Sequence, residues 1–365
     1  MRFPEFSGEW ETKSINDLAD VIGGGTPDTT VKSYWDGGIQ WFTPSEIGKN
    51  KFVDASLRTI TEDGLNNSSA KLLPPNTILL SSRATIGECS LSLRECATNQ
   101  GFQSLVSKKC NVDFLYYLIQ TKKKDLIRKS CGSTFLEISA NEVRKIQVSV
   151  PSDVEQQKIA GLLSLIDKRI ATQNKIIEKY KSLIKGIAQH CIKESISGIT
   201  YVKLGDICKI TTGKLDANAQ VDNGIFPFFT CAEQPFKIDN FAFDTEALLI
   251  SGNGANLGYI NYYKGKFNAY QRTYVLDLFS ENIQYIKWAL KVLLPKRIAI
   301  EKSSSNTPYI VLSTLTDLRL PIPSRGEQSF IANLMQSLER KLSNQIAQYD
   351  SYNYLKQYLL RQMFI

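Results

Sequence analysis

A stretch near the middle of the chain, PSDVEQQKIAGLL (151–163), occurs again near the end as PSRGEQSFIANLM (323–335). Proline, serine, glutamate, glutamine, isoleucine, alanine and leucine stand at identical places in both. An internal repeat constrains a fold more than a single motif does, because each copy has to form the same structural unit. We therefore expect two copies of one structural plan.

The repeat extends upstream of these stretches. The alternating segment 146–150 corresponds to 318–322, and both are typical of short strands that a proline ends. Further upstream, NTILLSS (76–82) resembles EALLISG (246–252). These correspondences predict an α+β fold in which two similar mixed α/β domains are each followed by a long helix.

The repeat also predicts the domain boundaries. The four expected segments are a first domain at 1–150, a first spacer helix at 151–198, a second domain at 199–322 and a second spacer helix at 323–365. Both helices begin with the same signals, a proline that ends the strand and then a serine followed three residues later by a glutamate. This serine–glutamate pair, Ser152 with Glu155 and Ser324 with Glu327, matches a capping box, which satisfies free N–H groups of the first helical turn.

Both spacer helices carry a seam whose positions recur at alternating steps of three and four residues, as in a coiled coil. The seam contains Ile166, Ile170, Gln173, Ile177 and Tyr180 in the first helix, and Leu338, Leu342, Gln345, Tyr349 and Tyr352 in the second. We expect the helices, each roughly 60 Å long, to pair as an antiparallel coiled coil about a pseudo-twofold axis. The two glutamines would meet or lie symmetrically about that axis. The alternative is that each helix packs only on its own domain.

The composition limits the classes of function. The chain has 365 residues, a net charge of +8 and a single histidine, His190, which we expect on a helix surface. One imidazole argues against Ser-His-Asp triads and multi-histidine metal sites, whereas the positive charge favours an anionic partner. Seven cysteines without a CxxC pair indicate reduced thiols. With no signal peptide and no apolar run of membrane-spanning length, we expect a cytoplasmic protein.

Sequence signatures of catalysis are missing. There is no GxxxxGK[ST] phosphate loop, and GNGANLG (252–258) lacks the βαβ context of a dinucleotide site. The SxxK spacing at 68–71 has no SDN or KTG partner. We therefore expect a protein that recognises its ligand without transforming it, and that binds no cofactor or metal itself.

Both domains carry polar and basic side chains of the kinds that contact DNA phosphates and base edges. Two such domains on a rigid spacer suit a DNA duplex, whose major-groove faces recur about 34–36 Å apart. The first-domain candidates are Thr26, Thr29, Lys32, Tyr34, Thr43, Ser45, Lys49, Arg83, Asn99, Gln100, Gln103, Lys122 and Lys123. The second-domain candidates are Thr211, Thr212, Lys214, Asn253, Asn256, Tyr270, Gln271, Arg272, Thr273, Lys296 and Arg297. Each group also has a purely structural alternative. The glycine-rich stretch GGGTP (23–27) could be only a turn, and the lysine run 122–124 could be only the solvated face of a helix. We expect Trp35 and Trp41 to be packing residues.

Several long strings resemble the specificity subunit of type I restriction-modification systems. They are GGGTPDTTVKSYWDGGIQWFTPSEIG, RTITEDGLNNSSAKLLPPNTILLSSRATIGE and TNQGFQSL in the first domain, and PIPSRGEQSFIANLM at the end of the second. The resemblance covers the whole chain. It implies that each domain reads one half of a split double-stranded DNA target and that the spacer helices set the gap. It also implies that two methyltransferase subunits and the restriction subunits assemble on the chain, with S-adenosylmethionine, ATP and magnesium belonging to those partners.

The residues leave a second hypothesis open, a non-enzymatic coiled-coil assembly protein whose paired domains bind protein or carbohydrate. It differs from the first in predicting no salt-sensitive DNA affinity and no co-purifying methyltransferase.

Overall fold

The computed structural model describes residues 2–132, 136–193, 200–302 and 309–364. The chain divides into two compact units, one of residues 1–174 with 347–365 and the other of residues 175–346. Each long helix, α6 (Asp153–Lys193) or α10 (Arg325–Met363), begins in one unit and ends in the other. The predicted boundary between the first spacer helix and the second domain, at residue 198, lies outside the described residues.

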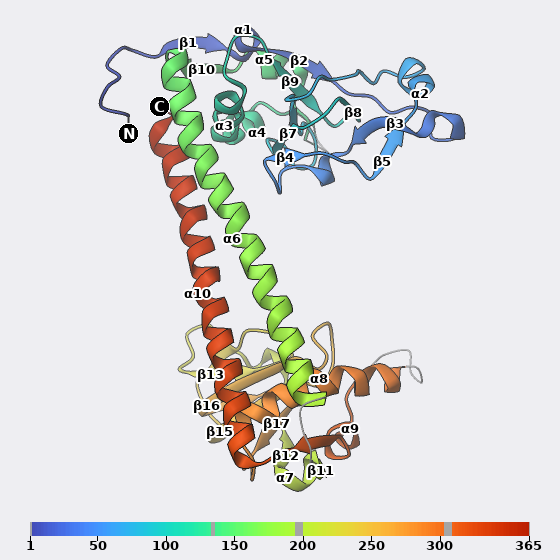
Figure 1. The fold of residues 1–365 in the computed structure, drawn as a ribbon, viewed down its shortest axis with the longest axis vertical. Coiled ribbons are helices and arrows are strands. Elements are labelled where there is room, and N and C mark those ends of the chain that lie inside the picture. Colours follow the sequence, from blue (N-terminus) through green and yellow to red (C-terminus); the bar gives the residue numbers. More distant parts are fainter. Residues whose placement is uncertain (1, 133–135, 194–199, 303–308, 365) are drawn as a thin grey trace. The chain divides into compact units, whose positions relative to one another are not determined.

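The first unit contains a mixed α/β domain (Figure 1). Its strands are β1 (Glu11–Ser14), β2 (Ala19–Gly23), β3 (Trp35–Phe42), β4 (Phe52–Val53), β5 (Arg58–Ile60), β6 (Ile78–Leu80), β7 (Cys89–Ser92), β8 (Cys96–Thr98), β9 (Gln103–Ser107) and β10 (Gln147–Val150). Its helices are α1 (Ile15–Leu18), η1 (Lys32–Tyr34), η2 (Pro44–Glu46), α2 (Glu62–Asn66), α3 (Val112–Thr121), α4 (Lys123–Arg128) and α5 (Ala140–Arg144). One sheet has the strand order β2-β9-β6-β7-β4 and a smaller one β5-β3-β8, while β1 pairs antiparallel with β10.

The second unit contains the second mixed α/β domain. Its strands are β11 (Thr200–Lys203), β12 (Lys209–Thr212), β13 (Phe226–Phe229), β14 (Phe236–Ile238), β15 (Phe243–Ser251), β16 (Ile260–Ala269), β17 (Thr273–Asp277) and β18 (Arg319–Ile322). Its helices are α7 (Leu204–Ile207), η3 (Ala217–Ala219), α8 (Ile283–Lys302) and α9 (Leu312–Thr316). The sheet order is β12-β17-β15-β16-β13-β14, and β11 pairs antiparallel with β18. The strands predicted at 146–150 and 318–322 are confirmed as β10 and β18.

The two domains share one topology. The run β2-β9-β6-β7 in the first sheet corresponds to β12-β17-β15-β16 in the second. Beside it, β3 pairs parallel with β8 and antiparallel with β5, just as β13 pairs parallel with β16 and antiparallel with β14. The domains differ because β16 is one long strand, whereas β7 and β8 are separate. The predicted internal repeat is therefore confirmed as a repeat of topology.

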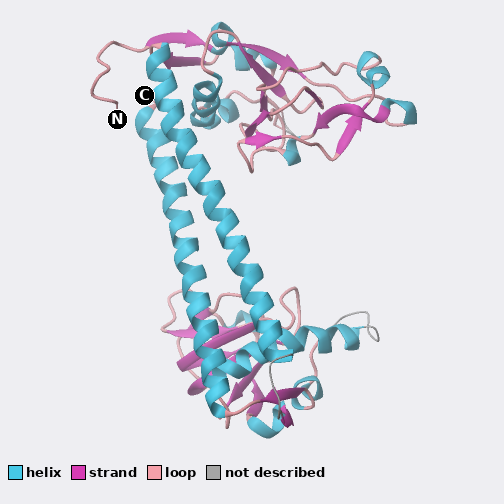
Figure 2. Cartoon of the chain, viewed as in Figure 1, coloured by secondary structure: helices cyan, strands magenta, loops and turns pink. Residues whose placement is uncertain are grey.

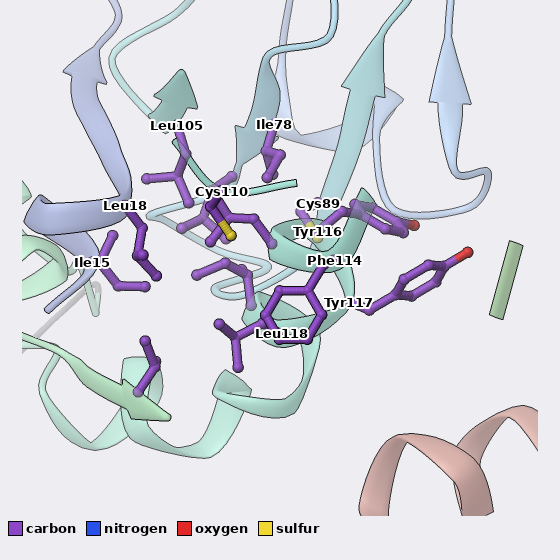
Figure 3. Close-up of a cluster of buried hydrophobic side chains, with 14 of the residues drawn as sticks. Ile15, Leu18, Ile78, Cys89, Leu105, Cys110, Phe114, Tyr116, Tyr117 and Leu118 are labelled. Carbon is purple, nitrogen blue, oxygen red and sulfur yellow. The ribbon is translucent and has the colours of Figure 1, made fainter. Parts of the chain in front are cut away.

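The core of the first domain lies between the five-stranded sheet and α3. The helix begins at the N-cap Asn111 and buries Phe114 and Leu118, which gather with Ile78 and Leu105 of the sheet (Figure 3). Complete burial of such a side chain contributes roughly 1.5–3 kcal/mol each. In the second domain α8 occupies the equivalent place and packs on its own sheet.

In each domain a buried glutamine from the repeated stretch joins the long helix to the start of the core helix, which is α3 in the first domain and α8 in the second. Oε1 of Gln156 accepts a hydrogen bond of 3.0 Å from the amide of Asn111, and its Nε2 donates one of 3.0 Å to the carbonyl of Pro151. Gln328 forms the equivalent two bonds, both of 3.0 Å, in the second unit. The two glutamines are only 3% and 1% exposed. We call these two residues the glutamine clamps, because each satisfies backbone groups of two elements that meet there.

The capping box predicted at both helix starts forms at only one of them. The amide of Ser324 donates to the Glu327 carboxylate (3.1 Å), and the amide of Glu327 donates to the Ser324 hydroxyl (3.3 Å). In the first copy Glu155 instead forms a bidentate ion pair with Arg2, with both N–O distances 2.7 Å. The prediction for Ser152 and Glu155 was therefore wrong, because a bidentate guanidinium binds a carboxylate more strongly than a neutral capping donor does.

The long helices are continuous (Figure 2) and pair within each unit. In the first unit α6 residues 159–166 share a core with α10 residues 359–363, and in the second unit α6 residues 184–192 share one with α10 residues 331–338. Rising numbers along α6 thus meet falling numbers along α10, which confirms antiparallel pairing. Every predicted seam position is buried or half-buried. The contact expected between the two seam glutamines would join the units and stays a prediction. No helix in the described part of the chain is long and apolar enough to cross a membrane.

A buried polar network attaches the first domain to both long helices. Lys51 Nζ lies 2.6 Å from the Asp113 carboxylate and donates to the Tyr117 hydroxyl over 3.1 Å. Tyr117 in turn donates to Asp167 of α6 (2.6 Å), which pairs with Lys356 of α10 (2.7 Å). Burial, and then the negative charge of Asp167, raise the pKa of Tyr117, so the phenol keeps the proton that it donates.

The second unit places a carboxylate at the same position of the repeat. Glu339 of α10 pairs with Lys287 (2.9 Å) and Lys291 (3.1 Å) of α8. Burial acts to raise the pKa of Glu339, but the two lysines together bring it below its ordinary value. Each domain therefore has two kinds of connection to its helices, a glutamine clamp and an acidic side chain.

Candidate nucleic-acid interface

The glycine turn of the first domain holds Thr26 against Gln100. The Thr26 hydroxyl lies 2.5 Å from Oε1 of Gln100, to which it donates. Gly24 makes this approach possible, because a Cβ there would lie 2.1 Å from the carbonyl oxygen of Asn99. The side-chain oxygen of Asn99 accepts a hydrogen bond of 2.9 Å from the amide of Gly101, so this side chain shapes the turn. The structure thus brings together three of the predicted residues and gives the glycine-rich stretch a role beyond that of a simple turn.

Glu46 arranges a second group of side chains beside that turn. Its carboxylate accepts from the amide and the hydroxyl of Thr43, both over 2.7 Å, and from the amide of Leu57 over 2.6 Å. The Thr43 hydroxyl lies 3.1 Å from that of Ser45. Leu57 is 86% exposed. The pyrrolidine ring that opens η2 lies against the turn at 99–101, so both groups belong to one surface.

Arg58, which sequence reasoning missed, lies next to Leu57. Its guanidinium carbon is 3.5 Å from the centroid of the Trp35 ring. Trp35 packs edge-on against Trp41, with ring centroids 5.1 Å apart, and Nε1 of Trp41 donates to the carbonyl of Gly25 over 2.9 Å. Both tryptophans are buried, as predicted. They connect Arg58 to the glycine turn through direct contacts.

The other first-domain candidates have different surroundings. Two cations are held in ion pairs: Arg83 with Glu137, and Lys123 with Glu88. Three candidates, Thr29, Lys32 and Tyr34, lie between Asp28 and Trp35, in the segment where the Asp28 carbonyl accepts a hydrogen bond of 3.1 Å from Nε1 of Trp35. Gln103 lies on β9, where it pairs with Gly23 of β2, and its Oε1 is buried. Two lysines stand at element ends, Lys49 after η2 and Lys122 between α3 and α4.

Loops of the second domain meet around Cys231, which sequence reasoning also missed. Its thiol donates to Oδ1 of Asn253 over 3.0 Å, and its carbonyl accepts from Nδ2 of Asn256 over 3.1 Å. The amide of Gln271 donates over 2.9 Å to the residue that follows Lys214. Gly213 has the role that Gly24 has in the first domain, since a Cβ there would lie 1.9 Å from the carbonyl of residue 269. These loops therefore form one cluster.

The turn between β16 and β17 completes this cluster. Arg272 is exposed there and forms no ion pair with any residue that the structure describes, and Tyr270 beside it is half-buried. Thr273 is only 2% exposed, so its hydroxyl is not presented to a ligand. Thr211 and Thr212 lie on β12, which pairs with β17, and not in the loops of the cluster. The two remaining candidates lie on α8, Lys296 exposed and Arg297 paired with Glu301 at 2.7 Å.

The shifted pKa values mark packed groups. Burial raises the pKa of the Cys89 and Cys208 thiols to about 12, which makes them poor nucleophiles. No group of three or more His, Cys, Asp or Glu side chains within the described ranges is arranged to hold a metal ion. His190 is exposed on α6, as predicted.

Two copies of one mixed α/β domain, each with a polar loop cluster and each clamped to a long helix, define a duplicated recognition protein. The chain belongs to the family of specificity subunits of type I restriction-modification systems, since the model described as type I restriction modification DNA specificity domain matches residues 7–181 and 196–349. This membership confirms the resemblance of the sequence strings. As a specificity subunit, the chain is non-catalytic by itself.

Individual relatives agree with this membership. The chain is 30% identical over 381 residues to the MjaIX specificity subunit of Methanocaldococcus jannaschii. This alignment covers 92% of this chain and 88% of that protein. A shorter match, 44% identical over 137 residues, links it to the EcoDI specificity subunit of Escherichia coli, over 38% of this chain and 30% of that protein.

Solved structures share the fold. The type I restriction-modification S subunit from M. genitalium has a TM-score of 0.65 and 19% identity, over 100% of this chain and 99% of that chain. A structure described for complex assembly and conformational transition of the type I R-M system has a TM-score of 0.63 and 16% identity, over 98% of both chains.

Proposed function

We propose that each domain of this chain reads one half of a split double-stranded DNA target and that the paired helices set the gap between the halves. The observation that carries this proposal is the duplicated loop cluster. In each domain a glycine, Gly24 after β2 or Gly213 after β12, lets its turn approach the loop that contains Gln100 or Gln271. Loops that recur at equivalent places of one fold fit two ligands of the same class.

We further propose that two methyltransferase subunits bind this chain and that restriction subunits join them. S-adenosylmethionine, ATP and magnesium would then be bound by these partners, and this chain would bind none of them. The net charge of +8 supports an anionic ligand. Membership among specificity subunits favours this function over the coiled-coil assembly protein that the sequence left open.

A gel shift of the chain with its methyltransferase partner tests the proposal. The probes are a duplex with the split target and duplexes in which the same halves stand a few base pairs further apart. We expect tight binding to the first probe alone, with an affinity that falls steeply as salt rises. Equal binding to all probes would show that the helices do not set the gap. An absence of salt-sensitive binding would show that DNA is not the ligand.

A further inference from the structure

Arg58 of the first domain and Phe236 of the second occupy one position of the shared topology. Arg58 opens β5 and lies opposite Trp41 of β3, while Phe236 opens β14 and lies opposite Phe228 of β13. In both domains the strand opposite ends one residue later and pairs in parallel with the strand that leads into the turn at Gln100 or Gln271. The pairing register therefore identifies the two residues as counterparts.

Their exposure follows the same pattern. Residues two apart on a strand face the same side, and two positions along from Arg58 and Phe236 stand Ile60 and Ile238, which are 0% and 4% exposed. Arg58 and Phe236 themselves are exposed, the latter by 44%. Each strand thus anchors in its core through an isoleucine and presents its first residue beyond the core, at the end of the sheet where the polar loops gather.

The two positions adjoin the loop clusters directly. Arg58 follows Leu57, whose amide is held by the carboxylate that also holds Thr43. Phe236 follows the short connection from β13 that carries Cys231, whose thiol binds Asn253. A ligand on either cluster would therefore reach the counterpart position.

Arg58 differs from the other arginines of its domain in having a free donor edge. Arg83, Arg94 and Arg128 are paired with carboxylates, and Arg144 donates to a side-chain amide and a backbone carbonyl. Among the residues that the structure describes, none accepts a hydrogen bond from the Arg58 guanidinium. Its guanidinium carbon lies 3.5 Å from the centroid of the Trp35 ring, and this contact restrains the guanidinium plane while the exposed side chain keeps its N–H groups open to a ligand.

We propose that this position reads a base in each half-target, and that Arg58 reads a guanine while Phe236 contacts a thymine methyl group. The proposal rests on the proposed function and assigns side chains within it. A planar guanidinium with a free donor edge matches O6 and N7 of guanine, and an exposed phenyl ring matches the apolar methyl group of thymine. A phosphate contact would require neither a restrained guanidinium plane nor a different residue at this position in the other domain. Base reading accounts for both of these observations.

The test uses the chain bound to its methyltransferase partner and a library of randomised DNA duplexes. Selection with the wild-type complex gives the two half-targets, and duplexes with each of the four bases at each position then give the discrimination. The variants are Arg58→Gln, Arg58→Lys and Phe236→Gln. Arg94→Gln is the matched control, because Arg94 is an exposed arginine of the same domain whose charge is already paired with Asp54 at 2.7 Å.

We expect Arg58→Gln to lower discrimination for guanine by about 10- to 100-fold at one position of one half-target. The other positions and the other half-target should not change. Arg58→Lys should retain part of the preference, because an ammonium donates to guanine without the bidentate fork. Phe236→Gln should relax one position of the opposite half-target, and Arg94→Gln should leave every position as in the wild type.

A uniform loss of affinity for all sequences in Arg58→Gln, with a smaller salt dependence, would show a phosphate contact and overturn the proposal. Unchanged discrimination in both Arg58→Gln and Phe236→Gln would overturn it as well. If the wild-type complex selected no split sequence, the proposed function itself would fail, and this result is separate from any outcome with the variants.

Discussion

Replacing a glutamine clamp by leucine should weaken the junction between a domain and its long helix. The variants are Gln156→Leu and Gln328→Leu, which keep the side-chain size and remove both hydrogen-bonding groups. In the first variant the amide of Asn111 loses its acceptor and the carbonyl of Pro151 loses a donor. The second variant does the same to the amide of Asn282 in the other unit.

The expected cost follows from the burial of these groups. A buried backbone group left without a partner costs about 1–3 kcal/mol. Two such groups, partly offset by the transfer of a leucine from water, amount to a loss of about 3 kcal/mol in the free energy of local opening. Because 1.4 kcal/mol corresponds to a factor of ten, exchange of the released amide should accelerate by about 100-fold.

Amide hydrogen exchange measured by mass spectrometry checks this prediction. Peptides that contain Asn111 should lose protection in Gln156→Leu, and peptides that contain Asn282 should lose it in Gln328→Leu. Each variant should leave the other unit unchanged, because the clamps share no partner. Gln157→Leu is the matched control, since Gln157 is the exposed neighbour of the first clamp. A change below about 0.5 kcal/mol in both variants, which is ordinary for surface positions, would refute the reasoning.

The remaining predictions use other parts of the chain. Inserting seven residues of heptad pattern within 166–184 should change the preferred gap in the DNA target and leave both half-sequences intact; methylated-adenine mapping that shows the old gap would contradict this. Arg272→Ala should weaken target binding by about 1–3 kcal/mol in a gel shift, and an unchanged affinity would remove this residue from the interface. Cys131 and Cys231 are the thiols that are not buried, so only these two should react quickly with a thiol reagent, and target DNA should protect Cys231; fast labelling of a third thiol would be inconsistent with the structure. Above about pH 8.5 the Cys89 thiol ionises in the unfolded chain but not in the folded protein, where its pKa is about 12. This difference should lower the free energy of unfolding by up to about 1.4 kcal/mol per pH unit. The urea midpoint of Cys89→Ala should therefore fall less between pH 8 and pH 10 than that of the wild type.

The sequence predicted the features that depend on local pattern or on internal comparison. The period of the seam positions and the proline–serine starts located both long helices, and the repeat located β10 and β18. The sequence did not show Arg58 on Trp35, because a stacking contact between two separate strands has no signature in the residues around either partner. For the same reason it missed the competition between Arg2 and the backbone amide of Ser152 for the Glu155 carboxylate. The loop clusters were predicted as groups of residue types, but their members depend on which strands end side by side.

The two copies of the repeat agree where a side chain satisfies buried backbone groups and differ where it faces solvent. Gln156 and Gln328 are the same residue in the same contacts, and any apolar replacement would leave buried groups unpaired. Arg58 and Phe236 stand at one position but share no chemistry, and a surface position away from such contacts usually tolerates replacement within about 0.5 kcal/mol. A substitution at the start of β5 or β14 therefore changes what a domain presents to its ligand without disturbing the clamp that holds the domain to its helix. This separation allows the half-target read by one domain to change while its junction with the long helix stays the same.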